Sequence, residues 1–334
     1  MTVRVGILGL GSIGQTHARC VAALWPAFEL TAYSSDDEVD PAVAGGAVRV
    51  SADELLQGDV DLVVVTTPSD LHGAHTVAAV RHGKAVVVEK PIATTAAAAR
   101  QAVAAWRQAG VFGSAIAQRR LEPHHQAIKA LLDAGRLGRP LLAEVSVCWW
   151  RTPDYYAQAP WRAQPPGGGV LMNQALHSVD LLTWLAGPAA AAAAFTGHAV
   201  HPIAAEDTAV AAVRMASGAF ATITASTATA PGRPATLRLH TDRGSFTLDH
   251  AAISEWDFPD VERPAAAADV VSGAGDPAAI GDAGHLAQWR DIAAAWQAGR
   301  PPAITLADGL PAVELIDAVY RSSATGAVVE IGGN

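Results

Sequence analysis

The feature that most constrains this chain is a glycine-rich turn near its start, Gly9-Leu10-Gly11-Ser12-Ile13-Gly14. The turn follows a continuous apolar run, Val3–Leu8, that predicts a buried strand, and it opens a segment of helical character, Ile13–Leu24. Glycines in such a unit permit a tight turn, backbone approach to a pyrophosphate, and close helix–strand packing. The helix N-terminus adds N–H groups and the positive end of its dipole. Gly9, Gly11, Ser12, Ile13 and Gly14 are therefore predicted to bind a dinucleotide.

The rest of the first 120 residues alternates apolar runs with helical segments. The predicted strands have no polar alternation, which is typical of a parallel sheet covered by helices on both faces. The pattern predicts a doubly wound, Rossmann-type α/β domain over residues 1–120. Further strands are expected at Phe28–Tyr33, Leu62–Thr66, Val86–Val88 and Val111–Ala117, with helices at Asp70–His82 and Thr94–Gln108.

After residue 120 the pattern changes to consecutive strands with short turns. A chain of 334 residues suits two domains, and residues 121–334 are predicted to form an α+β domain with a large, mostly antiparallel sheet. The last helix is expected either there or packed back against the first domain. The runs Ala96–Ala99 and Ala189–Ala194 are interpreted as helix-forming or space-filling alanine. Strands are expected at Pro140–Trp150, Ala204–Met215, Ala219–Ala228, Ala235–Thr241 and Gly244–Asp249, and helices at Pro123–Ala134, Leu176–Leu185, His285–Gln297 and Ala307–Ser323.

Composition excludes several classes of function. The formal net charge is −9 and no basic run is present, which disfavours nucleic acid as a partner. Cys20 and Cys148 alone imply no disulfide framework. No apolar run approaches the roughly 20 residues that span a bilayer, and the strand at Val3 leaves no room for a signal peptide. A cytoplasmic protein without a membrane partner is expected.

The end of the second predicted strand bears on the choice of cofactor. An acidic side chain there accepts from the ribose 2′-OH of NAD, whereas arginine favours the 2′-phosphate of NADP. This chain has Ser34-Ser35-Asp36-Asp37, with no Arg or Lys directly following. Ser35 and Asp36 are predicted to face the cofactor, and NAD is expected, with NADP as the alternative. The other reading treats both aspartates as solvated loop charges.

Three more motifs follow in order along the chain. Thr66-Thr67-Pro68-Ser69-Asp70-Leu71-His72 and Glu89-Lys90-Pro91 each follow a buried strand, and Gly167-Gly168-Gly169 opens a segment that ends at His177-Ser178-Val179-Asp180. Together with the glycine turn, this set resembles the glucose–fructose oxidoreductase, inositol dehydrogenase and rhizopine catabolism (Gfo/Idh/MocA) family over essentially the whole chain. The resemblance implies a second domain whose open sheet face forms a homodimer or homotetramer interface. It also implies reversible oxidation of a secondary alcohol on a sugar, inositol or related polyol.

Lys90 is the first candidate catalytic residue. It lies at the carboxyl end of a parallel strand, where open α/β sheets bind ligands, and Pro91 restricts the residue before it to extended geometry. Its ammonium can donate to the reacting oxygen or relay a proton. The competing reading is a solvated surface lysine. The resemblance adds the cofactor-binding residues Thr66, Thr67, Pro68, Leu71, His72, Glu89, Lys90 and Gln118.

His177 is the candidate general base for alcohol oxidation, because an imidazole exchanges protons near neutral pH. Asn173 lies four residues earlier and would share a helix face with it; Asp180 is either an orienting or a structural acid. Many members of the family carry aspartate where this chain has Asn173, and glycine where it has Ala175. Asn can hydrogen-bond but cannot hold negative charge. We interpret both changes as variation within an active enzyme.

An aromatic and cationic segment follows the strand that ends near Trp150. Aromatic faces cover sugar C–H surfaces while Arg and Tyr donate to hydroxyl groups, which suits a polyol site. A packing loop or a subunit contact is the alternative reading. The predicted substrate-binding residues are Arg119, Tyr155, Tyr156, Trp161, Arg162, Asn173 and His177.

Other chemistries are disfavoured. His124-His125 and His198…His201 lack a matching set of metal ligands at the usual spacing, so no metal is predicted, and the chain has neither a Gly-x-Ser-x-Gly elbow nor a P-loop. The expected mechanism places a carbinol beside the nicotinamide, between Lys90 and His177. Two alternatives remain: an NAD-dependent glycosidase of the same fold with tightly held cofactor, and a non-enzymatic dinucleotide sensor.

Overall fold

The structure, a computed structural model, describes residues 2–36, 38–249, 252–265 and 282–332. The chain forms two compact units. The first unit contains residues 1–118 and 282–313, and the second contains residues 119–281 and 314–334. The sequence analysis assigned residues 282–313 to the second domain, whereas here they pack with the first.

The first unit is built on a parallel sheet of six strands in the order β3-β2-β1-β4-β5-β6. This is the doubly wound order in which the strand sequence reverses between β1 and β4. The strands are β1 (Val3–Leu8), β2 (Phe28–Ser34), β3 (Val48–Arg49), β4 (Leu62–Val65), β5 (Ala85–Val88) and β6 (Gly113–Ala115). The helices between them are α1 (Ser12–Ala22), α2 (Pro41–Ala44), α3 (Ala52–Gln57), α4 (His72–Arg81) and α5 (Ala96–Ala109).

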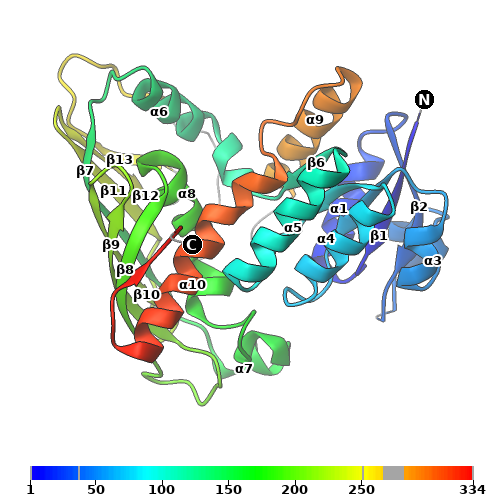
Figure 1. The fold of residues 1–334 in the computed structure, drawn as a ribbon, viewed down its shortest axis with the longest axis horizontal. Helices are drawn as coiled ribbons and strands as arrows, with labels where there is room; N and C mark the ends of the chain where they lie inside the picture. The colour runs from blue at the N-terminus through cyan, green and yellow to red at the C-terminus, as the bar shows by residue number, and fades with distance from the viewer. Residues whose placement is uncertain (1, 37, 250–251, 266–281, 333–334) are drawn as a thin grey trace. The chain divides into compact units, whose positions relative to one another are not determined.

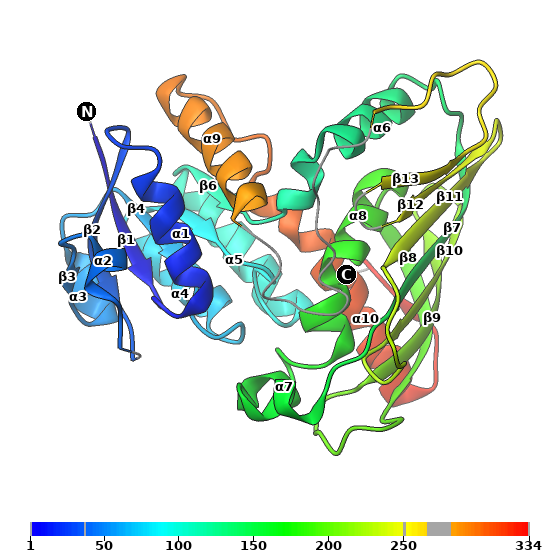
Figure 2. The same cartoon turned by 180° about the vertical axis from the view of Figure 1, so that it is seen from behind.

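Helices cover both faces of this sheet, which explains the continuous apolar strands (Figures 1 and 2). Successive residues of β4 enter opposite cores, Val63 and Val65 on one face and Leu62 and Val64 on the other. The first core includes residues of α4 and α5. The second includes residues of α1 together with Trp289 and Ile292 of α9 (Ala283–Gln297). The glycine turn and the strand ends that follow are therefore fixed to a rigid sheet.

The second unit is built on an eight-stranded sheet in the order β13-β12-β11-β7-β10-β9-β8-β14. Its pairs are antiparallel except β7 with β10, which are parallel. The strands are β7 (Pro140–Cys148), β8 (Ala189–Gly197), β9 (Thr208–Met215), β10 (Phe220–Ser226), β11 (Thr236–Thr241), β12 (Ser245–Asp249), β13 (Ala252–Trp256) and β14 (Val329–Glu330). The helices are α6 (Pro123–Asp133), α7 (Pro153–Ala157), α8 (Leu176–Ala186) and α10 (Leu310–Thr325), of which α10 begins in the first unit.

The two alanine runs take different structures. Ala96–Ala99 lies in α5, as expected for helix-forming alanine, but Ala189–Ala194 lies in strand β8. Alanine carries little shape information, and β8 is specified by its long antiparallel pairing with β9. Short elements β3, α2 and α3, and the edge strands β13 and β14, were also missed because each has too few apolar residues to show a period.

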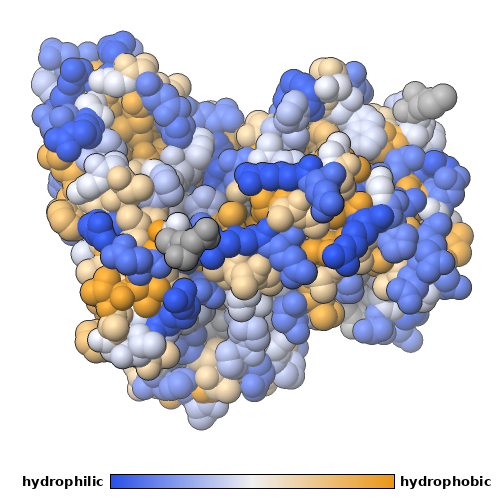
Figure 3. Space-filling model, viewed as in Figure 1, coloured by the Kyte–Doolittle hydropathy of each residue, from blue (hydrophilic) through white to orange (hydrophobic). Residues whose placement is uncertain are grey.

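One face of the second sheet carries exposed apolar side chains. β9 alternates buried Ala209, Ala211 and Val213 with outward residues, and α8 packs against the sheet through β7 and β11. On the outward face Phe195, 81% exposed, lies opposite Val210, 51% exposed. Figure 3 shows hydrophobic residues on the strand-bearing side of this unit. Among the described residues, every helix is too short or too polar to span a lipid bilayer.

Candidate active site

The glycine turn joins β1 to α1 and leaves the helix N-terminus open. Gly9 has a φ of +92°, and a Cβ there would lie 2.7 Å from the carbonyl oxygen of Thr66. A Cβ on Gly14 would lie 2.2 Å from the carbonyl oxygen of Gly9. Gly11 is the N-cap of α1, and none of the described side chains caps that end. Because the first N–H groups of a helix have no intrahelical partner, Ser12, Ile13 and Gly14 present donors that fit a pyrophosphate.

The loop after β4 supports this turn. The Thr66 hydroxyl donates to the carbonyl oxygen of Gly9 at 2.6 Å, so Thr66 holds the glycine turn in place. Thr67 contacts His75 through its hydroxyl, at 3.0 Å from Nδ1. His72 is buried, and its ring nitrogens each lie 2.7 Å from a carbonyl oxygen, that of Thr67 and that of Pro91. His72 therefore clamps two loops together, while Pro68 and Leu71 offer exposed apolar surface at the same sheet edge.

The end of β2 carries Ser35 and the exposed Asp36. Arg49, in the adjacent strand β3, donates from its guanidinium to the carbonyl oxygen of Ser35. The sequence analysis noted the lack of a cation directly after Ser35 and did not foresee Arg49. A residue 14 positions away reaches this point because β2 and β3 pair in parallel.

Glu89 and Lys90 follow β5. Glu89 was predicted to bind the cofactor, but it is 3% exposed and both its oxygens are engaged inside the unit. Its Oε1 lies 3.1 Å from Nε2 of His17 and 3.1 Å from Nε2 of His285, and its Oε2 accepts the N–H of Lys90 at 2.9 Å. Lys90 is half-buried. Burial lowers the pKa of its ammonium, and the neighbouring Glu89 carboxylate partly opposes that change.

Gln118 ends the first unit, in the short helix η1 (Gln118–Leu121). Its Oε1 is buried and lacks a hydrogen-bond partner among the described residues. An orphaned amide oxygen costs free energy unless a ligand or water donates to it. Gln118 is therefore suited to a bound group, as the sequence analysis proposed.

In the second unit the Gly167-Gly168-Gly169 motif leads into a π-helical turn, η3 (Val170–Ala175). Gly169 has a φ of +83°, and a Cβ there would lie 2.3 Å from a carboxylate oxygen of Glu206. That carboxylate accepts the N–H of Leu171 at 2.9 Å and the Tyr320 hydroxyl at 2.9 Å. Burial raises the pKa of Glu206, against the effect of these hydrogen bonds. Glu206 thus anchors the turn that carries Asn173.

Asn173 lies beside Tyr155 and two arginines. Its Nδ2 donates to the Tyr155 hydroxyl at 3.2 Å. The Arg162 guanidinium lies 4.2 Å from the centre of the Tyr155 ring, and that of Arg151 lies 5.4 Å away. Gln174 accepts from Arg151 at 2.9 Å and also donates to the Tyr155 hydroxyl. Three predicted substrate residues, Tyr155, Arg162 and Asn173, are therefore brought together.

Two other residues of the aromatic segment behave differently. Tyr156 is buried, and its hydroxyl lies 2.8 Å from that of Thr227, so this ring packs against the sheet. Trp161 is 44% exposed, with the Arg162 guanidinium 5.9 Å from its ring centre. Trp161 is thus available to a ligand, and Tyr156 contributes packing.

His177 is half-buried in the first turn of α8. Because Asn173 lies in a π-helical turn, their four-residue spacing is not the α-helical spacing assumed from the sequence. Asp180 is buried, and its carboxylate accepts hydrogen bonds from Nε of Arg120 at 2.9 Å and from Nη2 at 2.6 Å. These contacts favour a structural role for Asp180 over a role in orienting His177. Arg119 pairs with Glu122 at 3.2 Å.

The sequence analysis also overlooked a carboxylate near His124-His125. Oε2 of Glu122 lies 3.5 Å from Nε2 of His124 and 3.3 Å from Nδ1 of His125. These three residues form one of two His/Glu groups, among the described residues, whose ligand atoms cluster. Nδ1 of His125 donates to the carbonyl oxygen of Arg119, and the Arg119 guanidinium already supplies positive charge to Glu122. We assign no metal to this group.

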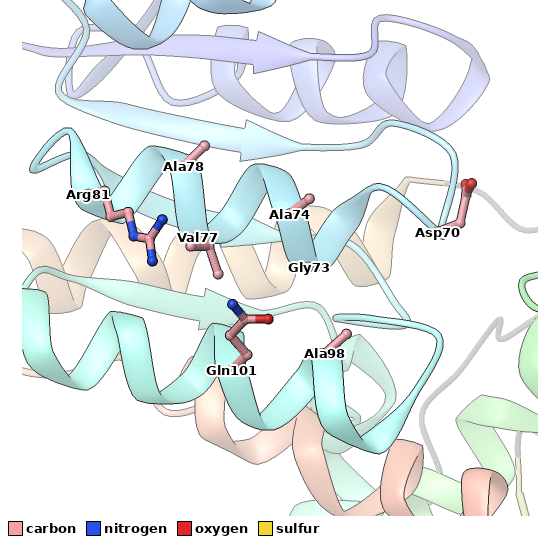
Figure 4. A pocket seen from close by; sticks show the side chains of 8 residues that line it. All are labelled: Asp70, Gly73, Ala74, Val77, Ala78, Arg81, Ala98 and Gln101. Carbon is pink, nitrogen blue, oxygen red and sulfur yellow. The ribbon is translucent and has the colours of Figure 1, made fainter.

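A surface groove on the first unit lies apart from the predicted residues. It runs between α4 and α5 (Figure 4), and no residue predicted to bind cofactor or substrate lines it. Its lining residues are Asp70, Gly73, Ala74, Val77, Ala78, Arg81, Ala98 and Gln101.

Comparisons with known proteins agree with this geometry. Residues 3–117 match the model of the oxidoreductase family with an NAD-binding Rossmann fold, and residues 125–247 match the Gfo/Idh/MocA C-terminal domain. The WlbA dehydrogenase from Bordetella pertussis, solved with NADH and UDP-GlcNAcA, is 30% identical over the whole of both chains, with a TM-score of 0.86. The chain belongs to the Gfo/Idh/MocA family of oxidoreductases.

The sequence of this chain also aligns with part of the length of two curated relatives. Inositol 2-dehydrogenase 3 from Saccharopolyspora erythraea is 34% identical over 55% of this chain and 54% of its own. The 1,5-anhydro-D-fructose reductase from Ensifer adhaerens is 33% identical over 64% of this chain and 63% of its own. The match thus spans between about half and two thirds of these relatives.

The first unit is therefore an NAD-binding domain, and the open N-terminus of α1 fits the pyrophosphate. The sequence analysis missed His17 and His285, which contact Glu89, and Trp289, which contacts His17. His17 had a weak signal, since it lies three residues after the last glycine of the turn. His285 and Trp289 had none, because their contacts with Glu89 and His17 arise only in the folded chain.

Proposed function

We propose that this protein is an NAD(P)-dependent oxidoreductase that interconverts a secondary alcohol and a ketone on a sugar, an inositol or a related polyol. One observation carries the proposal. A half-buried lysine of lowered pKa, Lys90, follows β5 on the sheet edge that also bears the glycine turn. Relatives named as inositol dehydrogenase and anhydrofructose reductase, and WlbA with its nucleotide-sugar ligand, support the substrate class.

The nicotinamide cofactor, when bound, would accept a hydride as NAD⁺ and supply one as NADH. Gly9, Gly11, Ser12, Ile13 and Gly14 hold its pyrophosphate, and Thr66 keeps the turn in shape. Gln118 accepts a hydrogen bond from a polar group of the cofactor or substrate, since its amide oxygen lacks a partner among the described residues.

Lys90 donates a hydrogen bond from Nζ to the reacting oxygen and stabilises alkoxide character there. Its lowered pKa brings proton exchange closer to neutral pH. His177 takes the hydroxyl proton during oxidation and returns it during reduction. Asn173 orients a substrate hydroxyl from the anchored η3 turn.

The aromatic and cationic residues of the second unit bind the sugar. The Tyr155 ring, held by Arg162 and Arg151, and the exposed Trp161 offer faces for C–H groups. Arg162 and Asn173 offer donors to hydroxyl groups. Arg119, the first residue of this unit, contacts the substrate.

The outward face of the second sheet is proposed to bind a second copy of the chain. Phe195 and Val210 form one apolar pair, and Phe220 and Leu142, 59% and 40% exposed, form another. Exposed apolar patches of this kind mark interaction surfaces. A homodimer or homotetramer is expected.

The deciding experiment follows the absorbance of reduced nicotinamide while inositols, aldoses and nucleotide sugars are offered with NAD and NADP separately. Wild-type protein is expected to form NADH with at least one polyol, and Lys90→Met to form it about 100-fold more slowly or worse. Activity with NADP alone would refute the cofactor choice. Consumption of a glycoside without net NADH would support the glycosidase reading instead, and NADH binding without any turnover would support the sensor.

A further inference from the structure

The buried carboxylate of Glu89 lies in a network of hydrogen-bonding groups. Glu89 is 3% exposed and His17 is fully buried, yet both are titratable. Oε1 of Glu89 faces Nε2 of His17 and Nε2 of His285, each at 3.1 Å, and Oε2 accepts the Lys90 N–H. All four residues belong to the first unit. A buried carboxylate is costly unless donors surround it, and here three donors do so.

Trp289 fixes the direction of this network. Its indole Nε1 lies 2.9 Å from Nδ1 of His17. Indole N–H is a donor only, so Nδ1 of His17 is the accepting nitrogen, and the ring proton sits on Nε2, facing Glu89. His17 is thus neutral, in agreement with the effect of burial, which lowers its pKa. The chain of donors runs from Trp289 to His17 to Glu89.

This direction rules out the other reading of the cluster. His17, Glu89 and His285 are close enough for their ligand atoms to hold a metal ion. A metal would need the lone pair on Nε2 of His17, but that nitrogen carries the proton because Nδ1 accepts from Trp289. The three donors instead keep Glu89 ionised. Burial alone would raise the pKa of Glu89, and the hydrogen bonds from His17 and His285 more than offset this, leaving it well below its usual value.

We propose that Trp289, His17 and His285 are positioning residues that hold the Glu89 carboxylate against the backbone N–H of Lys90 and so fix the direction of the catalytic lysine. The inference rests on the proposed function, in which Lys90 contacts the reacting oxygen. The Glu89 carboxylate fixes the backbone of Lys90 at its N–H group. Pro91, the next residue, restricts the backbone of Lys90 on its carboxyl side. Displacing a catalytic group by about 1 Å can lower the reaction rate by about 100-fold.

Matched variants test the direction of the network. Trp289→Phe removes the indole donor and keeps an aromatic ring, and Trp296→Phe is its control, since Trp296 lies in the same helix and packs on Phe28 and Phe112. His285→Gln keeps an N–H near the position of Nε2, whereas His285→Leu removes it. We expect Trp289→Phe and His285→Leu to lower kcat about tenfold, because a displacement of Lys90 smaller than about 1 Å should cost less than about 100-fold in rate. KM and the Kd for NADH should stay within about twofold of the wild-type values. Trp296→Phe and His285→Gln should resemble the wild type.

A second readout does not depend on turnover. Nitrogen-15 NMR of the histidine side chains should show His17 with a protonated Nε2 and an unprotonated Nδ1, and Trp289→Phe should raise the pKa of His17. The rate at which acetic anhydride labels Lys90, followed against pH by mass spectrometry, should report a lower lysine pKa in Glu89→Gln, because the anion beside the ammonium is gone.

The outcomes separate this inference from the proposed function. A protonated Nδ1 on His17, or equal kcat losses in Trp289→Phe and Trp296→Phe, would overturn the network. Absence of NADH formation from every alcohol would refute the proposed function, while the NMR and labelling results would still report on the network itself.

Discussion

A Cβ atom placed on Gly14 would lie 2.2 Å from the carbonyl oxygen of Gly9, so the first and last glycines of the turn exclude any larger side chain between them. The close approach of the Gly14 and Gly9 backbones brings the start of α1 against the end of β1, and it sets the position of the helix N–H groups. The cofactor turn is therefore defined by a backbone contact.

Gly14→Ala should weaken NADH binding by about tenfold or more, because the turn must open to admit the methyl group and the phosphate donors move. Nucleotide fluorescence titration measures the loss. Gly197→Ala is the control, since a Cβ at Gly197 would meet nothing within 4 Å and Gly197 lies in β8. Unchanged NADH affinity in Gly14→Ala would contradict the assignment of the turn.

Lys90→Met and His177→Asn should each lower kcat by about 10²- to 10⁴-fold, the usual contribution of a general acid or base. Both variants should still bind NADH, because neither side chain forms the pyrophosphate turn. Stopped assays of the alcohol identified in the screen give kcat, and fluorescence titration gives the Kd. If either variant keeps wild-type kcat, its residue has no role in proton transfer.

We expect Ser35 and Arg49 to control the choice between NAD and NADP. Ser35→Glu should leave NAD in use and lower kcat/KM for NADP by about tenfold, because a carboxylate accepts from the 2′-OH and repels a 2′-phosphate. Arg49→Ala should also lower NADP use, since Arg49 brings its guanidinium to the carbonyl of Ser35. The ratio of kcat/KM for the two cofactors is the measurement. A ratio unchanged in both variants would place the selecting residues elsewhere.

Asp207 should make the stability of the second unit depend on pH. Its buried carboxylate accepts the N–H groups of Ala199, Val200 and His201. Burial alone would raise the pKa of Asp207, but these bonds lower it below its ordinary value. Its contribution is therefore fully present above the unfolded pKa of about 3.9 and is lost as pH falls through the lower folded pKa.

Asp207→Asn should accordingly lower the free energy of unfolding by about 1–3 kcal/mol at pH 7. The difference from wild type should shrink in acid. Urea denaturation at several pH values measures both proteins. A difference that stays constant down to the acid transition would show that the carboxylate charge is not what stabilises this loop.

Phe195→Asp should dissociate an assembly formed through the outward face of the second sheet, because it places a charge opposite Val210 in the apolar patch. Light scattering after size exclusion gives the mass. Val200→Asp, an exposed apolar position outside the strands, serves as the control. An assembly that survives Phe195→Asp unchanged would refute the proposed interface.

The sequence predicted the first unit well, because a parallel strand buried on both faces is a continuous apolar run. β1 has the predicted bounds, and β2, β4 and β5 differ from theirs by a residue or so. The sheet order of the second unit and strand β8 could not be predicted. The alanines of β8 suit a helix equally well, and only pairing with β9 decides between the two.

The candidate site was predictable where chemistry follows local sequence. The glycine turn, Lys90 and the Tyr155–Arg162–Asn173 group come from short motifs. The π-helical turn is held by Glu206, 35 residues beyond Leu171, and so has no local signature. The contacts of Glu89 could not be predicted for the same reason. Its hydrogen-bond partners His17 and His285 come from helices at opposite ends of the chain.

The return of α9 to the first unit has a consequence for synthesis. Trp289 is fully buried among residues of β1, β4 and α1, yet it is made more than 160 residues after the part of that core that residues 3–116 supply. Residues 1–118 emerging alone from a ribosome would expose the apolar surface that α9 later covers. The nucleotide-binding unit is therefore completed only after strands β7 to β13 of the other unit have been translated.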